Sequence, residues 1–304
     1  MEFLKTLQGV RTPLFDSIFG AITHLGDETF FMLVSLVVMW CLNKKWGFRI
    51  LLIGVTGSVA NQLLKGIFVI PRPWVLDPTF PIVESAREAA GGYSFPSGHT
   101  HSAASVFGVL AVWLRKKWVT IGCIVAVLLV GFSRMYLGVH TPLDVGTSLV
   151  LGPVMVIAMA AMLSGRNENK RLISVALGAL ALAVVSLVYL YNAPPTEHSI
   201  PEVDAEGIAN MWKLAGVLLG IAIAAWVDHR YTHFEVAAPL WGQIIKVAGG
   251  AALVMGVRLG LKPVFAAMFG EQAFLDGVRY LLMTVIGGAV WPMTFRFFQG
   301  KKSA

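Results

Sequence analysis

The clearest chemical pattern in this sequence is a polar stretch, SRMYLGVHTPLD at 133–144, that follows a long apolar run. Thr141 is a good N-cap residue and Pro142 suits the first helical position, so Asp144 should lie in the first turn of a helix. A carboxylate there points back before the cap and could accept a hydrogen bond from His140. The other nitrogen of His140 would then be free as a nucleophile. The simpler alternative is that Asp144 only caps its own helix, and both roles are compatible.

Two further clusters precede this stretch. In KGIFVIPRP, Lys65 and Arg72 are seven residues apart, so a helix would carry both on one face until the prolines end it. In FPSGHTH, Ser97 is a natural N-cap, Gly98 lets the backbone approach a ligand, and His99 lies in the first turn, where it could donate a proton. A helix N-terminus with free N–H groups also favours bound phosphate.

The elements that carry these clusters belong in a membrane. The 304 residues are 56% hydrophobic and 13% charged, against about 25% charged in ordinary soluble domains. Because a spanning helix needs about 20 mostly apolar residues, we predict an all-α, polytopic transmembrane helix bundle. Its expected nine spans are 27–43, 49–70, 97–114, 118–138, 143–163, 172–191, 210–227, 238–260 and 277–296. The segment at 261–276 could instead be re-entrant or interfacial.

Basic residues gather at alternate connections between the expected spans. Five connections hold 13 of the 24 lysines and arginines and only three of the 17 acids. The positive-inside rule places these connections in the cytoplasm. The N-terminus and all three clusters then lie on the extracytoplasmic side, and the C-terminus lies in the cytoplasm. The net charge of +7 thus reflects orientation, and we expect no nucleic-acid partner. The two cysteines, Cys41 and Cys123, are not expected to form a disulfide.

Taken singly, each cluster has an ordinary structural explanation. Lys65 could snorkel to the membrane interface, and the PSGH stretch could be a turn before an unspecialised helix. Together, however, the clusters bring Lys65, Arg72 and Arg134 to one membrane face, beside a helix N-terminus and two histidines. That combination predicts a site for a phosphate dianion, with a nucleophile and an acid next to it.

The same residues resemble the type-2 phosphatidic acid phosphatase superfamily, which includes lipid phosphate phosphatases, glucose-6-phosphatase and the vanadium haloperoxidases. The signature of that superfamily is Lys-x6-Arg-Pro, Pro-Ser-Gly-His and Ser-Arg-x5-His-x3-Asp. Here it runs from Lys65 to Arg72-Pro73, over residues 96–99, and from Ser133-Arg134 to His140 and Asp144, without departure. The resemblance covers roughly residues 27–163.

The resemblance implies a role for each matching residue. His140 would attack phosphorus and form a phosphohistidine, Asp144 would orient it, and His99 would protonate the leaving oxygen. The phosphoryl oxygens would be held by Lys65, Arg72, Ser97, Gly98 and Arg134. Enzymes of this superfamily need no metal, which agrees with the lack of a carboxylate cluster suited to magnesium. We therefore expect no metal and no cofactor.

The expected substrate is a membrane lipid phosphate monoester or diphosphate. Candidates are a polyprenyl diphosphate such as undecaprenyl diphosphate, a phosphatidate, or a sphingosine phosphate. One alternative is a glucose-6-phosphatase-like enzyme acting on a soluble sugar phosphate, although that branch lacks the aspartate found at Asp144. Another alternative is a lipid-phosphate transporter or flippase without hydrolysis. The pair of His99 and His140 counts against it, since binding alone needs neither.

Three regions follow from these patterns. We predict an interfacial amphipathic helix at 1–26, a phosphatase catalytic bundle at 27–163, and a C-terminal transmembrane extension of unknown role at 164–304. We expect an integral protein of a bacterial inner membrane. HLGDE at 24–28 could reach the pocket and contact substrate, but we interpret it as interfacial. The acids at 197–206 are interpreted as a solvated loop.

Overall fold

The computed structural model describes residues 1–298 of the chain. Every regular element within that range is a helix and none is a strand, so the all-α prediction is confirmed. Seven helices are long and apolar enough to cross a membrane, or eight if the bent pair Pro13–Gly26 and Glu28–Leu42 counts as one span. The chain is therefore an integral membrane protein. The basic residues Lys301 and Lys302 of the expected cytoplasmic tail lie outside the described range.

Each of the nine predicted spans falls on one helix or on consecutive helical segments. One of them, α6 (Gly98–Leu114), has 17 residues, slightly fewer than the roughly 20 that usually cross a bilayer. In contrast, α11 (Leu240–Phe269) continues as one 30-residue helix through most of the segment that could have been re-entrant. The last predicted span is built from three consecutive pieces: α12 (Ala273–Val285), η5 (Ile286–Val290) and α13 (Trp291–Met293).

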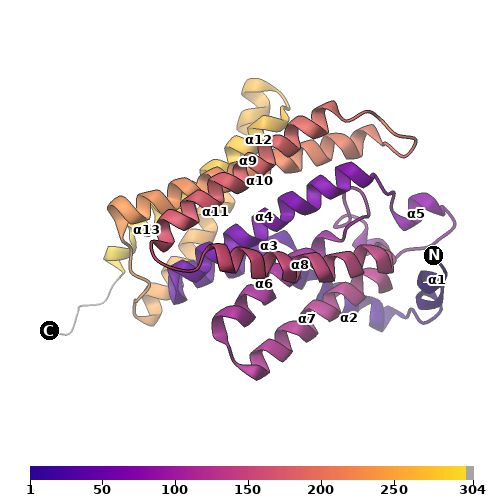
Figure 1. Cartoon of the computed structure of the whole chain (residues 1–304), viewed down its shortest axis with the longest axis horizontal. Coiled ribbons are helices and arrows are strands. Elements are labelled where there is room, and N and C mark those ends of the chain that lie inside the picture. Colours follow the sequence, from indigo (N-terminus) through magenta and orange to yellow (C-terminus); the bar gives the residue numbers. More distant parts are fainter. Residues whose placement is uncertain (299–304) are drawn as a thin grey trace. The chain divides into compact units, whose positions relative to one another are not determined.

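The chain folds as two compact units, each drawn from separate stretches of sequence. The first unit comprises Met1–Phe31, Gly57–Ala158 and Val188–Ile208. It contains α6 and α7 (Lys117–Tyr136), which Figure 1 shows as a helical hairpin, together with α8 (Pro142–Met162). It also contains the second half of α4 (Lys44–Phe68), the end of α9 (Glu168–Asn192) and the start of α10 (Pro201–Val227).

Small residues let the helices of the first unit approach closely. A Cβ added to Gly152 on α8 would lie 2.5 Å from the Cβ of Ala104 on α6, and one added to Gly131 on α7 would lie 2.9 Å from Val145 on α8. Close contact at small residues is a common way for membrane helices to pack. This packing brings the start of α6, the end of α7 and the start of α8 together.

The N-terminal segment is attached to the end of α7. It forms α1 (Glu2–Gln8), α2 (Pro13–Thr23) and the turn η1 (His24–Gly26). Arg11 donates hydrogen bonds to the carbonyl oxygens of Tyr136 (2.9 Å) and Pro81 (2.6 Å), and the Tyr136 hydroxyl donates to Asp16 (2.8 Å). The predicted single helix at 1–26 is therefore two helices and a turn. Its exposed side carries the apolar residues Leu14, Phe15 and Ile18.

The second unit comprises Met32–Thr56, Met159–Leu187 and the chain from Ala209 onward. Its interior holds a buried lysine, Lys246, which donates to the carbonyl oxygen of Val236 (3.0 Å). Two tryptophan side chains complete the local network. Trp40 donates to the carbonyl oxygen of Gly287 (2.9 Å), and Trp291 donates to that of Lys246 (3.0 Å). These hydrogen bonds satisfy the buried ammonium of Lys246 and the indole N–H groups of both tryptophans.

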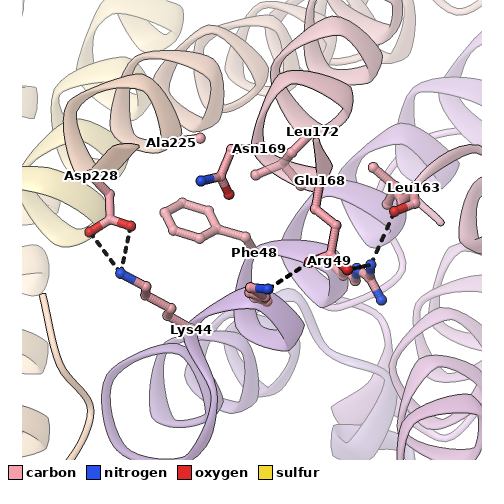
Figure 2. A pocket seen from close by; sticks show the side chains of 10 residues that line it. Lys44, Phe48, Arg49, Leu163, Glu168, Asn169, Leu172, Ala225 and Asp228 are labelled. Carbon is pink, nitrogen blue, oxygen red and sulfur yellow. Dashed lines mark hydrogen bonds and ion pairs between the residues drawn. The ribbon is translucent and has the colours of Figure 1, made fainter. Parts of the chain in front are cut away.

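Ion pairs join three helices at one end of the second unit (Figure 2). Lys44 contacts Asp228 (2.8 Å), Lys45 contacts Glu168 (2.9 Å), and Arg49 donates to the carbonyl oxygen of Leu163 (3.0 Å). The cavity between them has a volume of about 60 Å³. It is lined by none of the residues predicted to bind phosphate. Asp228 and Glu168 thus pair with basic residues at the start of α4.

Candidate active site

Two buried cations, Lys65 and Arg72, form one side of the site. Lys65 lies in the last turn of α4 and Arg72 directly before the short helix α5 (Pro73–Leu76), with 7% and 5% of their surfaces exposed. Between them, Val69 adopts a left-handed conformation (φ 48°), which is unusual for a β-branched residue. The chain therefore leaves the helix abruptly and returns Arg72 toward the same buried region as Lys65.

A short loop, Gly91 to Tyr93, holds both cations through its carbonyl oxygens. Lys65 donates to Tyr93, and Arg72 donates to Gly92 (2.9 Å) and Gly91 (2.5 Å). Gly92 has a positive φ of 70°, where glycine is favoured because it has no Cβ. The loop thus fixes the positions of both charges. The expectation that one helical face carries both is wrong, because α4 ends at Phe68 and Arg72 lies beyond it.

The third cation, Arg134, is completely buried in the last turn of α7. Its guanidinium donates to the hydroxyl of Thr23 (2.9 Å) and reaches the carbonyl oxygen of Ala89 (3.5 Å). Its Nε is buried and finds no hydrogen-bond partner among residues 1–298. A buried charged donor without a partner is costly. This atom is therefore well suited to an anionic ligand.

The start of α6 forms as the sequence predicts. The Ser97 hydroxyl caps the helix by accepting from the N–H of Thr100 (3.4 Å), and the Ser97 N–H donates to the Asp144 carbonyl oxygen (3.1 Å). A Cβ added to Gly98 would meet a single described atom within 4 Å, Oδ1 of Asn61 at 3.9 Å. Space for a ligand therefore remains beside the Gly98 backbone. The His99 Nε2 lies 2.7 Å from Oδ1 of Asp27.

His140 and Asp144 meet at the start of α8, and each has 1% of its surface exposed. Oδ2 of Asp144 accepts from the Thr141 N–H (2.7 Å) and the Ser94 hydroxyl (2.6 Å), and it lies 3.4 Å from Nδ1 of His140. The Thr141 hydroxyl accepts from the Asp144 N–H (3.3 Å) in return. The carboxylate therefore caps its helix and faces the histidine at the same time.

The surroundings of His140 favour one neutral tautomer. Arg72 donates to Nε2 (2.8 Å), so Nε2 must carry the lone pair, and Nδ1 carries the proton that faces Asp144. His140 lies in the connection between α7 and α8. Burial, and next the nearby charges of Arg72, Arg134 and Lys65, lower the pKa of His140 well below its usual value of 6.5. The imidazole is therefore neutral at neutral pH, as a nucleophile must be.

All eight predicted site residues lie in the first unit. Hydrogen bonds connect five of them: Arg72 to His140, the His140 N–H to the Arg134 carbonyl oxygen (3.3 Å), and the Ser97 N–H to the Asp144 carbonyl oxygen (3.1 Å). The site is mainly cationic, and within the described range no three His, Cys, Asp or Glu side chains gather in a way that could hold a metal ion. Its charge and free donors suit an anion such as phosphate.

Several residues that contact the site are not predicted by the sequence. The interpretation of the acids at 197–206 as a solvated loop is wrong for two of them. Asp204 accepts from the Tyr93 hydroxyl (2.8 Å), and Glu206 accepts from the Gly92 N–H (3.1 Å), which ties the start of α10 to the loop that holds the cations. More than 100 residues separate the partners, so no local spacing could have indicated these contacts. Asp27, which the sequence suggests is interfacial, instead lies 2.7 Å from His99.

Comparison with known proteins agrees with this geometry. The model of the PAP2 superfamily matches residues 46–168, and the model of the transmembrane extension of PAP2 superfamily phosphatases matches residues 212–303. Phosphatidylglycerophosphatase B of Bacillus subtilis is 34% identical over 47% of this chain and 72% of its own length. Undecaprenyl-diphosphatase BcrC of the same organism is 30% identical over 49% of this chain and 77% of its own length.

A further relative aligns with nearly the whole chain. The probable sphingosine-1-phosphate phosphatase of Dictyostelium discoideum is 23% identical over 98% of this chain and 71% of its own length. Among solved structures, the transmembrane PAP2 type phosphatidylglycerolphosphate phosphatase of B. subtilis is 28% identical over 53% of this chain and 82% of its own, with a TM-score of 0.43. The matched models and the identity to the bacterial phosphatases show that the chain belongs to the PAP2 superfamily.

Proposed function

We propose that the protein is a membrane phosphatase that hydrolyses a lipid phosphate monoester or diphosphate through a phosphohistidine at His140. The observation that carries this proposal is the buried pair of His140 and Asp144, surrounded by Lys65, Arg72 and Arg134. A nucleophile oriented by a carboxylate, in a pocket of cations, is what transfer of a phosphoryl dianion requires. The relatives reported above, named for lipid phosphates, support the same substrate class.

In the first half of the reaction, Nε2 of His140 attacks phosphorus while the bond from phosphorus to the lipid oxygen breaks. His99 gives its proton to the departing oxygen, so the lipid leaves as an alcohol, or as a monophosphate when the substrate is a diphosphate. The phosphorylated imidazole gains positive charge, which Asp144 stabilises. Arg134, through its unpartnered Nε, binds a phosphoryl oxygen together with the other two cations.

In the second half, a water molecule attacks the phosphohistidine. His99 accepts the proton of that water, the N–P bond breaks, and its electron pair returns to Nε2 of His140. Inorganic phosphate leaves and both histidines regain their starting protonation. The cations and the free N–H groups at the start of α6 stabilise the charge of the transition state. No step requires a metal ion, and we propose that the enzyme is metal-independent.

The site is proposed to open on the extracytoplasmic side, with the C-terminus in the cytoplasm, in a bacterial inner membrane. The distribution of lysine and arginine over alternate connections supports this orientation. A lipid phosphate in the outer half of the bilayer would then present its headgroup at the level of the ends of α6, α7 and α8.

The decisive experiment measures phosphate release by the purified protein in detergent with excess chelator. The substrates are undecaprenyl diphosphate, phosphatidate, sphingosine 1-phosphate and glucose 6-phosphate, and His140→Ala is the control. We expect release from the lipids, little from the sugar phosphate, and none from the variant. Release from glucose 6-phosphate alone would replace the lipid proposal with the sugar phosphatase. Silence of both proteins on every substrate would favour a lipid-phosphate transporter.

A further inference from the structure

A second carboxylate lies beside the other histidine of the site. Asp27 occupies the break between η1 and α3 (Glu28–Val37), where the chain bends by 52°. Its Oδ1 is 2.7 Å from Nε2 of His99, and its Oδ2 is 2.6 Å from Nδ1 of His24. The side chain of His99 is 16% exposed, whereas that of His24 is 69% exposed. Asp27 thus connects a buried histidine of the site to one at the surface.

The backbone before Asp27 is packed directly on His99. A Cβ added to Gly26 would lie 2.6 Å from the carbonyl oxygen of His99 and 2.9 Å from Cγ1 of Val130. Real Cβ atoms do not approach backbone so closely, so only glycine fits at this position without a shift. Thr23, one turn earlier, also accepts a hydrogen bond from Arg134. The turn at 23–27 is therefore fixed against the site at several points.

His99 needs a counter-charge if it is to act as an acid. The charged groups that face it are Arg134 on α7, Arg72 before α5 and Asp27, and His140 lies close by. Two of these are guanidinium groups, which repel a protonated imidazole. Asp27 is the carboxylate in contact with the ring, and it favours the protonated form. Nε2 lies 2.7 Å from Oδ1 of Asp27, within ion-pair distance, so Nδ1 is the ring nitrogen that remains for the leaving oxygen.

We propose that Asp27 is a positioning residue that orients His99 as the general acid and favours its protonated form against the two guanidinium groups, in the way that Asp144 orients the nucleophile His140. This proposal rests on the proposed function. Proton balance is unchanged: His99 gives its proton to the leaving oxygen and recovers one from water, while Asp27 stays ionised throughout. The site then contains two histidine–aspartate pairs. His140 and Asp144 serve phosphoryl transfer, and His99 and Asp27 serve proton transfer.

A purely structural role for Asp27 is the competing explanation. Asp27 directly precedes α3, where aspartate is a favoured N-cap, and asparagine caps a helix about as well. Asp27→Asn therefore keeps the shape and the capping ability while it removes the charge. The neighbouring acid Glu28 is exposed, so Glu28→Gln removes one negative charge from the same turn and serves as the matched control.

The test compares two substrates that differ in their leaving group. An alkyl phosphate needs protonation of its leaving oxygen, whereas p-nitrophenyl phosphate does not. We expect Asp27→Asn to lower kcat about 10- to 100-fold on the alkyl phosphate, because general-acid assistance is weakened. On p-nitrophenyl phosphate we expect a loss of less than about 5-fold. The alkaline limb of kcat/KM should also move to lower pH. Asp27→Glu, which restores the carboxylate, should bring that limb back, and Glu28→Gln should behave as wild type.

Each contrary result has its own meaning. If Asp27→Asn lost equal activity on both substrates, with the alkaline limb unmoved, Asp27 would be a structural residue and the proposal would be overturned. Full activity of Asp27→Asn on the alkyl phosphate would overturn it too. In both cases the active wild-type protein would still support the proposed function. A wild-type protein that hydrolysed neither substrate would instead remove the proposed function and this inference together.

Discussion

Asp144 makes two kinds of contact that a substitution can separate. Its carboxylate orients His140 and also forms a reciprocal cap with Thr141. We expect Asp144→Asn to lower kcat by roughly 10³–10⁴, because the loss of an orienting carboxylate leaves the histidine in the wrong tautomer. The melting temperature of this variant should change little, since asparagine also accepts capping hydrogen bonds. Thr141→Ala should do the reverse, with a stability loss of about 1 kcal/mol and kcat near that of the wild type. Steady-state kinetics and thermal melting measure both variants.

The protonation of His140 predicts the acid side of the activity profile. Burial and the neighbouring cations lower the pKa of His140 below 6.5, so the neutral, nucleophilic form persists as the pH falls to that value. The acid limb of kcat/KM, which reports the free enzyme, should therefore lie below pH 6.5. The profile can be measured with a short-chain, water-soluble substrate whose own ionisation is known. An acid limb at or above pH 6.5 would show that the cations do not act on the nucleophile as described.

At this scale the sequence predicts the reacting groups but not all their partners. Ser97, His140 and Asp144 follow from spacing and capping preferences, because each lies within a few residues of a helix start. Thr23 and Asp27 contact Arg134 and His99 from segments far away along the chain. Their local sequence, HLGDE, is typical of an interface as well as of a site. Only the folded contacts distinguish the two.

Among the helices, the packing of α8 on α6 decides whether the site can form. The contact depends on Gly152, where a Cβ would lie 2.5 Å from that of Ala104. Gly152→Ala should therefore destabilise the protein by about 1–3 kcal/mol and reduce activity, because α8 carries Asp144 and α6 carries His99.

A glycine on the same helix provides the control for this variant. A Cβ at Gly146 would meet no described atom within 4 Å. Gly146→Ala should therefore leave activity unchanged and stabilise the helix slightly. Melting temperatures and phosphate release of the two variants are compared in the same detergent. Equal stability of both variants would contradict the proposed tight contact.

Helix positions follow well from hydropathy because lipid imposes a length and an apolar composition on every span. Each of the nine predicted spans falls on one helix or on consecutive helical segments, and the caps at Ser97 and Thr141 fall where expected. Hydropathy does not report on segments that dock through hydrogen bonds. Examples are the division of residues 1–26 into two helices, attached by Arg11, and the contact of Glu206 with Gly92.

For the whole molecule, the orientation in the membrane can be tested by labelling. In a variant lacking Cys41 and Cys123, we introduce single cysteines at Glu197, which is exposed on an expected outer loop, and at Lys116, which is exposed between α6 and α7. A membrane-impermeant maleimide should label Glu197→Cys in intact cells and Lys116→Cys only after permeabilisation. The opposite pattern would place the site on the cytoplasmic side.

The two compact units show what a linear sequence leaves unspecified. Each unit combines three separated stretches, and α4, α9 and α10 each contribute residues to both. Hydropathy orders the spans along the chain but carries no information on which of them pack together. Charge is informative at one place, where Lys44 and Lys45 at the start of α4 pair with Asp228 and Glu168.

One contact described above bears on chemical selectivity. In the free protein the lone pair of Nε2 on His140 is engaged by the guanidinium of Arg72. A neutral electrophile, such as an uncharged ester or alkylating agent, has no negative charge to compete for that guanidinium. The lone pair of Nε2 therefore stays hydrogen-bonded to Arg72. If His140 is the nucleophile, as proposed, a phosphate dianion would compete for the same guanidinium and so free Nε2 for attack. The site would then distinguish an anionic substrate from neutral electrophiles in the bilayer before any bond is made.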